Sequence, residues 1–273
     1  MVLSIIEQLA YSTVRIECET KDGKIVTGTG FFFNFKEMEN GNSIPVVITN
    51  KHVIKDSKKG TLIFTRSENS EPNDISHFRI LVDNFECAWR LHPDENVDLC
   101  AMAIATLINE AEKQKVNLFY RTLNFSFLPK EEHLSELSPL EDIVMVGYPC
   151  GLWDTINNQP IFRKGVMATH PCKDYDGKPS FVVDIGCFPG SSGSPVFIYN
   201  NGGYTNKKGD LIWGKSRLIL MGILYGGFMH STEGNIVESE IPTTMSMRWV
   251  SRIPNNLGLV VKSSKIRDLE DLF

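Results

Sequence analysis

Hydrophobic residues alternate with polar ones over short stretches of the chain, which is the period of a β-strand rather than that of a helix. Val14, Ile16 and Cys18 alternate with charged residues, and this pattern predicts a strand with one buried face. Two more strands are predicted over 24–34 and 46–48. Others are predicted near 78–82, 87–91, 98–103, 143–147, 161–169, 181–185, 194–198 and 218–225. Many short strands separated by turn residues are typical of an all-β sandwich or of β-barrels.

Helical patterns are rare in the chain. Ser4 and Glu7 form the pattern of a capping box, which predicts a short helix ending near Ala10. The segment 103–115 carries apolar residues at helical spacing and predicts a second helix. The length of 273 residues suffices for about two domains of roughly 150 residues each.

Composition and charge exclude several classes of protein. Hydrophobic residues make up 42% and charged residues 22% of the chain, which is close to the globular average and excludes a disordered or fibrous protein. The net charge of −5 argues against nucleic acid or an anionic membrane as a partner. No apolar run approaches the length of about 20 residues that a membrane span needs.

The N-terminal residues and the cysteines predict the compartment. The chain starts without the basic segment and small-residue cleavage site of a signal peptide. The six cysteines show neither metal-type nor disulfide-framework spacing. We therefore expect a cytoplasmic protein with reduced thiols, no metal and no other cofactor.

A loop rich in glycine and serine, residues 188–195, is the first candidate for chemistry. Ser192 lies between Gly190 and Gly193, and glycines let backbone N–H groups converge near a hydroxyl, as an oxyanion hole requires. The same residues also fit an ordinary turn.

His52 and Asp98 are the second and third candidates. His52 follows the apolar strand 46–48, which would hold it rigidly, as a general base must be held. Asp98 is followed by apolar residues that would draw it inward, where a carboxylate needs a partner such as a histidine N–H. Taken alone, His52 also fits a structural histidine and Asp98 a turn or strand cap.

The order of the three candidates along the chain is informative. The order His, Asp, Ser is that of chymotrypsin-type enzymes, whereas subtilisins and α/β-hydrolases use other orders. An α/β-hydrolase is disfavoured further, because Ser194 stands where its nucleophile elbow needs a second glycine.

Motifs spread over most of the chain carry a resemblance to one family. They are Gly28-Thr29-Gly30-Phe31, Ile48-Thr49-Asn50-Lys51-His52-Val53-Ile54, Val97-Asp98-Leu99, Gly147-Tyr148-Pro149-Cys150-Gly151-Leu152 and Pro189 to Pro195. With them the chain resembles the trypsin-like serine peptidases of the chymotrypsin-fold superfamily. The resemblance is nearest to the bacterial HtrA-like (trypsin-2) branch, without the PDZ domain of that branch.

This resemblance implies two antiparallel six-stranded β-barrels with few short helices and the active site in the cleft between them. Residues 1–125 would form the barrel that carries His52 and Asp98, and residues 126–253 the barrel that carries Ser192. Residues 254–273 would be left as a C-terminal tail.

The resemblance also implies a catalytic triad and an acyl-enzyme mechanism. Ser192 would attack the peptide carbonyl, His52 would transfer the proton, and Asp98 would orient His52. The N–H groups of Gly190 and Ser192, with Ser191 between them, would form the oxyanion hole. Ser191 replaces the aspartate that pairs with a newly cut N-terminus in trypsin-type zymogens, so that mode of activation is not expected here.

A substrate pocket is implied by the same resemblance. Its predicted lining residues are Gly186, Cys187, Phe188, Gly222, Leu224, Tyr225 and Gly226. Gly186 stands where trypsin-type enzymes keep an aspartate, so a basic P1 residue is not expected and an apolar one is favoured.

The sequence leaves two other functions open. One is a catalytically silent protease-fold binding or adaptor protein, and the other is an esterase or acyl transferase that uses the same triad. For a serine endopeptidase we expect a protein or peptide substrate. Because a cytoplasmic protease endangers its host, we also expect restraint by a regulatory partner, a narrow specificity or an incompletely formed oxyanion hole.

Overall fold

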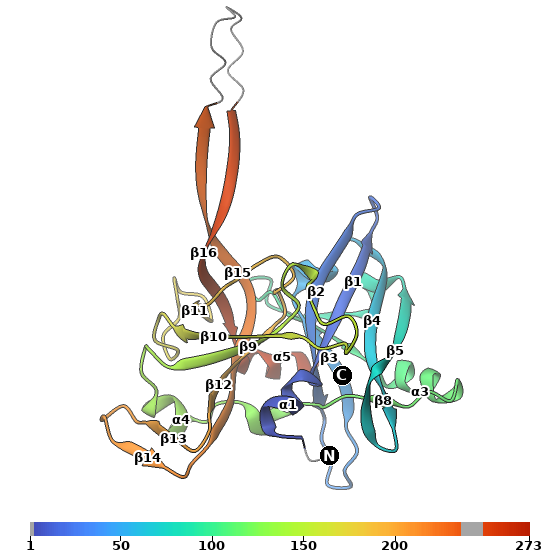
Figure 1. Ribbon diagram of the computed structural model, residues 1–273, viewed down its shortest axis with the longest axis horizontal. Coiled ribbons are helices and arrows are strands. Elements are labelled where there is room, and N and C mark those ends of the chain that lie inside the picture. The colour runs from blue at the N-terminus through green and yellow to red at the C-terminus, as the bar shows by residue number, and fades with distance from the viewer. Residues whose placement is uncertain (1–2, 236–247) are drawn as a thin grey trace, which may run out of the picture.

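Two β-structures, one from each half of the chain, lie side by side (Figure 1). The computed structural model describes residues 3–235 and 248–273, and of residues 230–235 and 248–254 it describes the backbone alone. We call the two structures the first lobe and the second lobe.

The first lobe is a single antiparallel sheet. Its strands are β1 (Thr13–Thr20), β2 (Ile25–Phe35), β3 (Ile44–Thr49), β4 (Ser57–Glu68), β5 (Glu71–Asp83), β6 (Arg90–Leu91), β7 (Cys100–Ala103) and β8 (Leu118–Phe119). They run in the order β5-β4-β1-β2-β3-β7-β6, with β8 paired to β4. The hydrogen-bonded path does not return from β6 to β5 in the described residues. β6 has two residues, and the 3₁₀ helix η1 (Phe85–Ala88) occupies part of the segment where the sequence predicts a strand.

The second lobe is a closed barrel of six strands in the order β10-β11-β16-β15-β12-β9. These strands are β9 (Asp142–Gly147), β10 (Ile161–Met167), β11 (Ser180–Asp184), β12 (Pro195–Asn200), β15 (Arg217–Asn235) and β16 (Arg248–Lys262). A small hairpin, β13 (Gly203–Thr205) and β14 (Leu211–Trp213), lies outside the barrel. The predicted all-β class is confirmed, and with it one closed six-stranded barrel.

The helices are short. They are α1 (Ile5–Ala10), α2 (Lys51–Ile54), α3 (Ala105–Lys113), α4 (Glu131–Glu136) and α5 (Ile266–Glu270), with the 3₁₀ helices η1, η2 (Phe125–Phe127), η3 (Pro149–Gly151) and η4 (Ser263–Lys265). α1 begins with the predicted capping box, in which the Ser4 N–H donates to Glu7 Oε2 at 2.7 Å. Within the described residues, no helix has the length and apolarity to cross a membrane.

Strand β1 shows how the local pattern meets tertiary packing. Its predicted apolar face is buried, since Val14, Ile16 and Cys18 lie in the core of the first lobe. The opposite face is partly covered as well: Arg15 is buried, donates to the Gly151 carbonyl and lies with its guanidinium carbon 3.7 Å from the ring centroid of Trp153. This contact ties the second lobe to the first.

A hydrophobic cluster spans both lobes. Phe31 and Phe33 of β2 pack in one core with Val146, Phe197 and Leu220 of the second lobe. Because fully burying such a side chain stabilises a fold by about 1.5–3 kcal/mol, the two lobes hold each other in place. The contact between the two lobes is therefore part of a shared core.

The last twenty residues do not form a separate tail, which corrects the boundary predicted at residue 253. β16 continues to Lys262, and its Val261 pairs with Ser180 of β11 inside the closed barrel. Beyond it, Ile266 and Leu269 of α5 are fully buried in the shared core. One partner strand of this segment, β11, lies about 80 residues earlier in the chain, and the other, β15, lies about 30–40 residues earlier, so no local pattern reveals them.

Candidate active site

Strand register brings His52 and Asp98 to the same end of the first lobe. β3 and β7 are antiparallel, with Thr49 opposite Cys100. The chain leaves β3 at Thr49 and enters α2, which contains His52, while Asp98 lies just before β7. The end of one strand therefore adjoins the start of the other, and the two side chains meet there.

Asp98 holds His52 by two contacts. Asp98 Oδ2 lies 2.5 Å from His52 Nδ1, and Asp98 Oδ1 accepts the His52 backbone N–H at 3.1 Å. A carboxylate can only accept, so Nδ1 carries the proton and Nε2 presents its lone pair on the far side of the ring. Asn50, fully buried, donates from its side chain to the Asp98 carbonyl at 2.7 Å. The His52 side chain is 47% exposed, so its free nitrogen is open to a substrate.

The loop of Ser192 lies against the first lobe close to His52. The Ser192 carbonyl accepts the Thr29 N–H at 2.9 Å, and the Thr29 carbonyl accepts the Thr49 hydroxyl at 2.7 Å. Thr49 is three residues before His52. Ser192 is half-buried, and within the described part of the chain no hydrogen bond joins its Oγ to the His52 ring.

Two backbone N–H groups of this loop have no hydrogen-bond acceptor among the described residues. The Pro189 carbonyl accepts the Cys150 N–H, and because a peptide bond is trans, the N–H of Gly190 points the opposite way. The Ser191 N–H donates to the Phe188 carbonyl at 3.0 Å. Among the residues described, the N–H groups of Gly190 and Ser192 donate to no protein acceptor.

Gly190 must be a glycine at this point. Its φ is +86°, and a Cβ there would lie 2.6 Å from the Tyr148 carbonyl oxygen and 3.1 Å from the Gly151 nitrogen. The loop therefore approaches the backbone of residues 148–151 more closely than any side chain allows.

Thr29 of β2 joins the first lobe to this loop and to Tyr148 of the second lobe. Its hydroxyl donates to the Gly190 carbonyl at 3.0 Å and accepts the Tyr148 N–H at 3.0 Å. The residue is fully buried. One side chain of the first lobe thus holds two peptide groups of the second.

Cys187 and Leu224 of the predicted pocket come together in the core of the second lobe. Two glycines that the sequence analysis did not identify also lie at Cys187. A Cβ on Gly258 would be 2.5 Å from its Sγ, and one on Gly227 would be 3.6 Å from its Cβ. Burial raises the pKa of the Cys187 thiol to about 11, so it stays protonated at neutral pH.

Gly222, another residue of the predicted pocket, lies against strand β16. A Cβ on Gly222 would lie 2.1 Å from the Val261 carbonyl oxygen, so this glycine faces strand β16 within the barrel. Tyr225 packs against the core shared by the lobes, and Gly226 has only a distant neighbour at its Cβ position.

Arg163 of β10 is a further residue that the sequence analysis missed. Its Nη1 donates to the Gly186 carbonyl at 3.0 Å, and its guanidinium carbon lies 4.8 Å from the centroid of the Phe188 ring. The pattern of strand 161–169 reveals no such role, because the contact depends on how β10 lies beside a segment more than twenty residues later.

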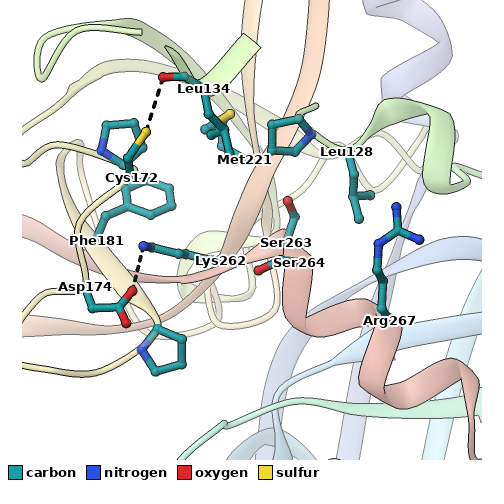
Figure 2. Close-up of a pocket in the computed structure, with 13 residues that line it drawn as sticks. Leu128, Leu134, Cys172, Asp174, Phe181, Met221, Lys262, Ser263, Ser264 and Arg267 are labelled. Atoms are coloured by element: carbon teal, nitrogen blue, oxygen red, sulfur yellow. Dashed lines mark hydrogen bonds and ion pairs between the residues drawn. The ribbon is translucent and has the colours of Figure 1, made fainter. Parts of the chain in front are cut away.

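A hollow of about 410 Å³ lies elsewhere in the molecule (Figure 2). Figure 2 shows the ion pair of Lys262 with Asp174 and the Cys172 thiol directed at the Leu134 carbonyl, with Arg267 on the opposite side of the hollow. Lys262 Nζ lies 2.7 Å from Asp174 Oδ1. None of the predicted site residues lines this hollow. The chemistry of the Ser192 loop is therefore separate from it.

Comparison with known proteins places the fold and the family. A sequence model of the trypsin-like peptidase domain matches residues 28–203. No curated protein matches the chain. The chain is similar to the solved structure of a mutant of the Tobacco Etch Virus protease, with a TM-score of 0.50 at 11% identity over 100% of this chain and 81% of that one. This likeness supports the predicted chymotrypsin-like fold.

Two bacterial structures are also similar. One is the Rv3671c protease from M. tuberculosis in its active form, with a TM-score of 0.47 at 16% identity, covering 94% of this chain and 78% of that one. The other is a serine endoprotease from Yersinia pestis, with a TM-score of 0.48 at 16% identity, covering 100% of this chain and 67% of that one.

Proposed function

The chain belongs to the family of trypsin-like peptidase domains and is a serine protease, and we propose that it is an endopeptidase in which Ser192 is the nucleophile, His52 the general base and Asp98 the residue that orients His52. The observation that carries this proposal is the His52–Asp98 pair, held by two contacts at the edge of the Ser192 loop. An aspartate that fixes the histidine tautomer in this way leaves Nε2 ready to accept a proton.

In the first half of the reaction, Ser192 Oγ attacks the carbonyl carbon of the scissile peptide bond while its proton moves to His52 Nε2. The new C–O bond converts the carbonyl oxygen into an oxyanion, which the free N–H groups of Gly190 and Ser192 would stabilise. His52, now positively charged beside Asp98, then gives its proton to the leaving amine. The C–N bond breaks, and the acyl-enzyme remains on Ser192.

In the second half, water replaces the amine. His52 Nε2 takes a proton from the water as its oxygen attacks the acyl carbon, and the same two N–H groups receive the oxyanion again. Collapse of this intermediate breaks the bond to Ser192 Oγ, which regains its proton from His52. The cycle starts from a hydrogen bond between Ser192 Oγ and His52 Nε2. This hydrogen bond would form when the substrate binds, since catalytic hydrogen bonds are often long in free enzymes.

Labelling with a fluorophosphonate, which reacts with activated serines, tests this proposal. We expect the wild-type chain to be labelled and Ser192→Ala to be silent. Ser194→Ala is a matched control, because Ser194 lies in the same loop with its hydroxyl buried and unbonded, and it should keep the label. Absence of label on a folded wild-type chain would favour the catalytically silent binding protein. Turnover of ester substrates without turnover of matched peptides would favour an esterase or acyl transferase.

We further propose that the isolated chain can form its oxyanion hole without a partner. Support comes from the Cys150 N–H, which holds the Pro189 carbonyl away from the site and leaves the Gly190 N–H free. Restraint in the cell would then come from a narrow specificity or from a partner that limits access. Cleavage of well-matched peptides by the purified chain, with little cleavage of unfolded casein, is the expected result.

A further inference from the structure

We propose that Arg163 makes this enzyme select an acidic residue, Glu or Asp, at the P1 position of its substrate. This inference rests on the proposed endopeptidase function and specifies its substrate class. It narrows the expectation of a non-basic P1 residue and replaces the apolar preference drawn from the sequence.

The Arg163 guanidinium lies directly against Gly186. A Cβ built on Gly186 would lie 2.0 Å from Arg163 Nη1, so the guanidinium occupies the space in which a side chain of residue 186 would begin. By the family resemblance, this is the position from which trypsin-type enzymes direct an aspartate at a basic P1 side chain. In this chain the Arg163 guanidinium occupies that space, so the charge there is positive instead of negative.

Among the described residues, this cation has no anionic partner. By contrast, Arg15 and Arg217, whose side chains are largely buried, each form an ion pair with a glutamate at 2.9 Å. Arg163 is half-buried and forms no ion pair within the described residues, and its Nε is buried without any hydrogen-bond acceptor. Asp184, in the neighbouring strand β11, is exposed and lies outside ion-pair distance.

The contacts that Arg163 makes hold its guanidinium in one orientation. Nη1 donates to the Gly186 carbonyl, and the Phe188 ring lies 4.8 Å from the guanidinium carbon. These contacts fix the plane of the group but leave donors without an acceptor among the residues that the structure describes. A guanidinium presents several donors in one plane and binds a carboxylate through two of them. An acidic P1 side chain would supply such an acceptor.

Paired peptide substrates test the proposal directly. Fluorogenic peptides that differ only in Glu or Gln at P1 have the same shape and differ in charge. We expect the purified full-length chain to show a kcat/KM about 10- to 100-fold higher for Glu, as a bond to a charged group supplies. Arg163→Gln should bring this ratio to about one, and Arg163→Lys should keep a reduced preference because it retains the charge but not the fork.

Lys164→Gln is the matched control. It removes the same charge from the next residue of β10, whose amino group pairs with Asp142 at 2.8 Å on an exposed face. This variant should keep the wild-type ratio. Thermal unfolding of each variant shows whether it is folded, and binding of the Glu and Gln peptides to Ser192→Ala gives a second measure that needs no turnover.

Two results would overturn the inference while leaving the proposed function intact. One is a wild-type chain that takes the fluorophosphonate label but cleaves Glu and Gln peptides equally. The other is a preference for Glu that persists in Arg163→Gln. Failure of the proposed function would look different, since the wild-type chain would then take no label and cleave neither peptide.

Discussion

Replacement of Gly190 by alanine tests the oxyanion hole at its most constrained residue. The φ of +86° at Gly190 costs an alanine about 1–2 kcal/mol in backbone strain. The new Cβ would also lie 2.6 Å from the Tyr148 carbonyl oxygen and 3.1 Å from the Gly151 nitrogen, and both are backbone atoms that cannot rotate away. The loop must therefore move, and the Gly190 N–H moves with it.

The expected effect is mainly on catalysis. Loss of one oxyanion donor typically removes about 2.7–4 kcal/mol of transition-state stabilisation, which corresponds to a loss of about 10²- to 10³-fold in kcat. Gly202→Ala is the matched control, because Gly202 has a φ of +79° and no atom within 4 Å of its Cβ position. It bears similar backbone strain without the collision and should keep full activity.

The assay combines kcat for a cleaved peptide, the rate of fluorophosphonate labelling and Tm. We expect both variants to remain folded and only Gly190→Ala to lose turnover and label. If folded Gly190→Ala retained kcat within about threefold of Gly202→Ala, the role assigned to the Gly190 N–H would be refuted, because the loss of a donor costs far more than that.

Three other changes have definite expected outcomes. Asp98→Asn should lower kcat by about 10⁴-fold with little change in Tm, because an amide no longer fixes the His52 tautomer; steady-state kinetics measures this, and near-normal turnover would contradict it. Thr29→Val should lower the free energy of unfolding by about 1–3 kcal/mol in urea, since two buried peptide groups lose their partner; an unchanged urea midpoint would count against this bridge between the lobes. Burial raises the pKa of the Cys18 and Cys187 thiols to about 11 from an ordinary 9.0. Their contribution to stability is therefore complete below about pH 9 and is lost as the pH rises towards 11. Replacing both cysteines by alanine should make the free energy of unfolding fall less steeply above pH 9. An equally steep fall would contradict this expectation.

Local patterns predicted much of the architecture. The alternation at Val14, Ile16 and Cys18 identified a strand and its buried face, because side-chain direction in a strand depends only on neighbouring residues. The capping box of Ser4 and Glu7 identified a helix start, because its hydrogen bonds join residues only three positions apart. The alternation of side chains and the capping box each depend on residues only a few positions apart, so a short window of sequence is enough to predict them.

The candidate site was predicted in part. His52, Asp98 and Ser192 were identified from their local surroundings and their order along the chain; the structure joins His52 to Asp98 and packs the loop of Ser192 against Thr29 of the first lobe. The pocket residues stay a prediction; in the structure Gly222 faces β16, and Gly258, which the sequence did not single out, approaches Cys187. A glycine in a strand indicates that something lies close to it, but the sequence does not say what.

Only the tertiary structure decided the remaining features. The orientation of the Gly190 N–H depends on Cys150, forty residues earlier, and the cation at Gly186 comes from another strand. Residues 254–273, assigned from sequence to a tail, close the barrel and cover the core shared by the lobes. The sequence by itself determined the elements and the chemical groups available to them. Register between distant strands decided which groups meet, because those contacts join segments that no local pattern connects.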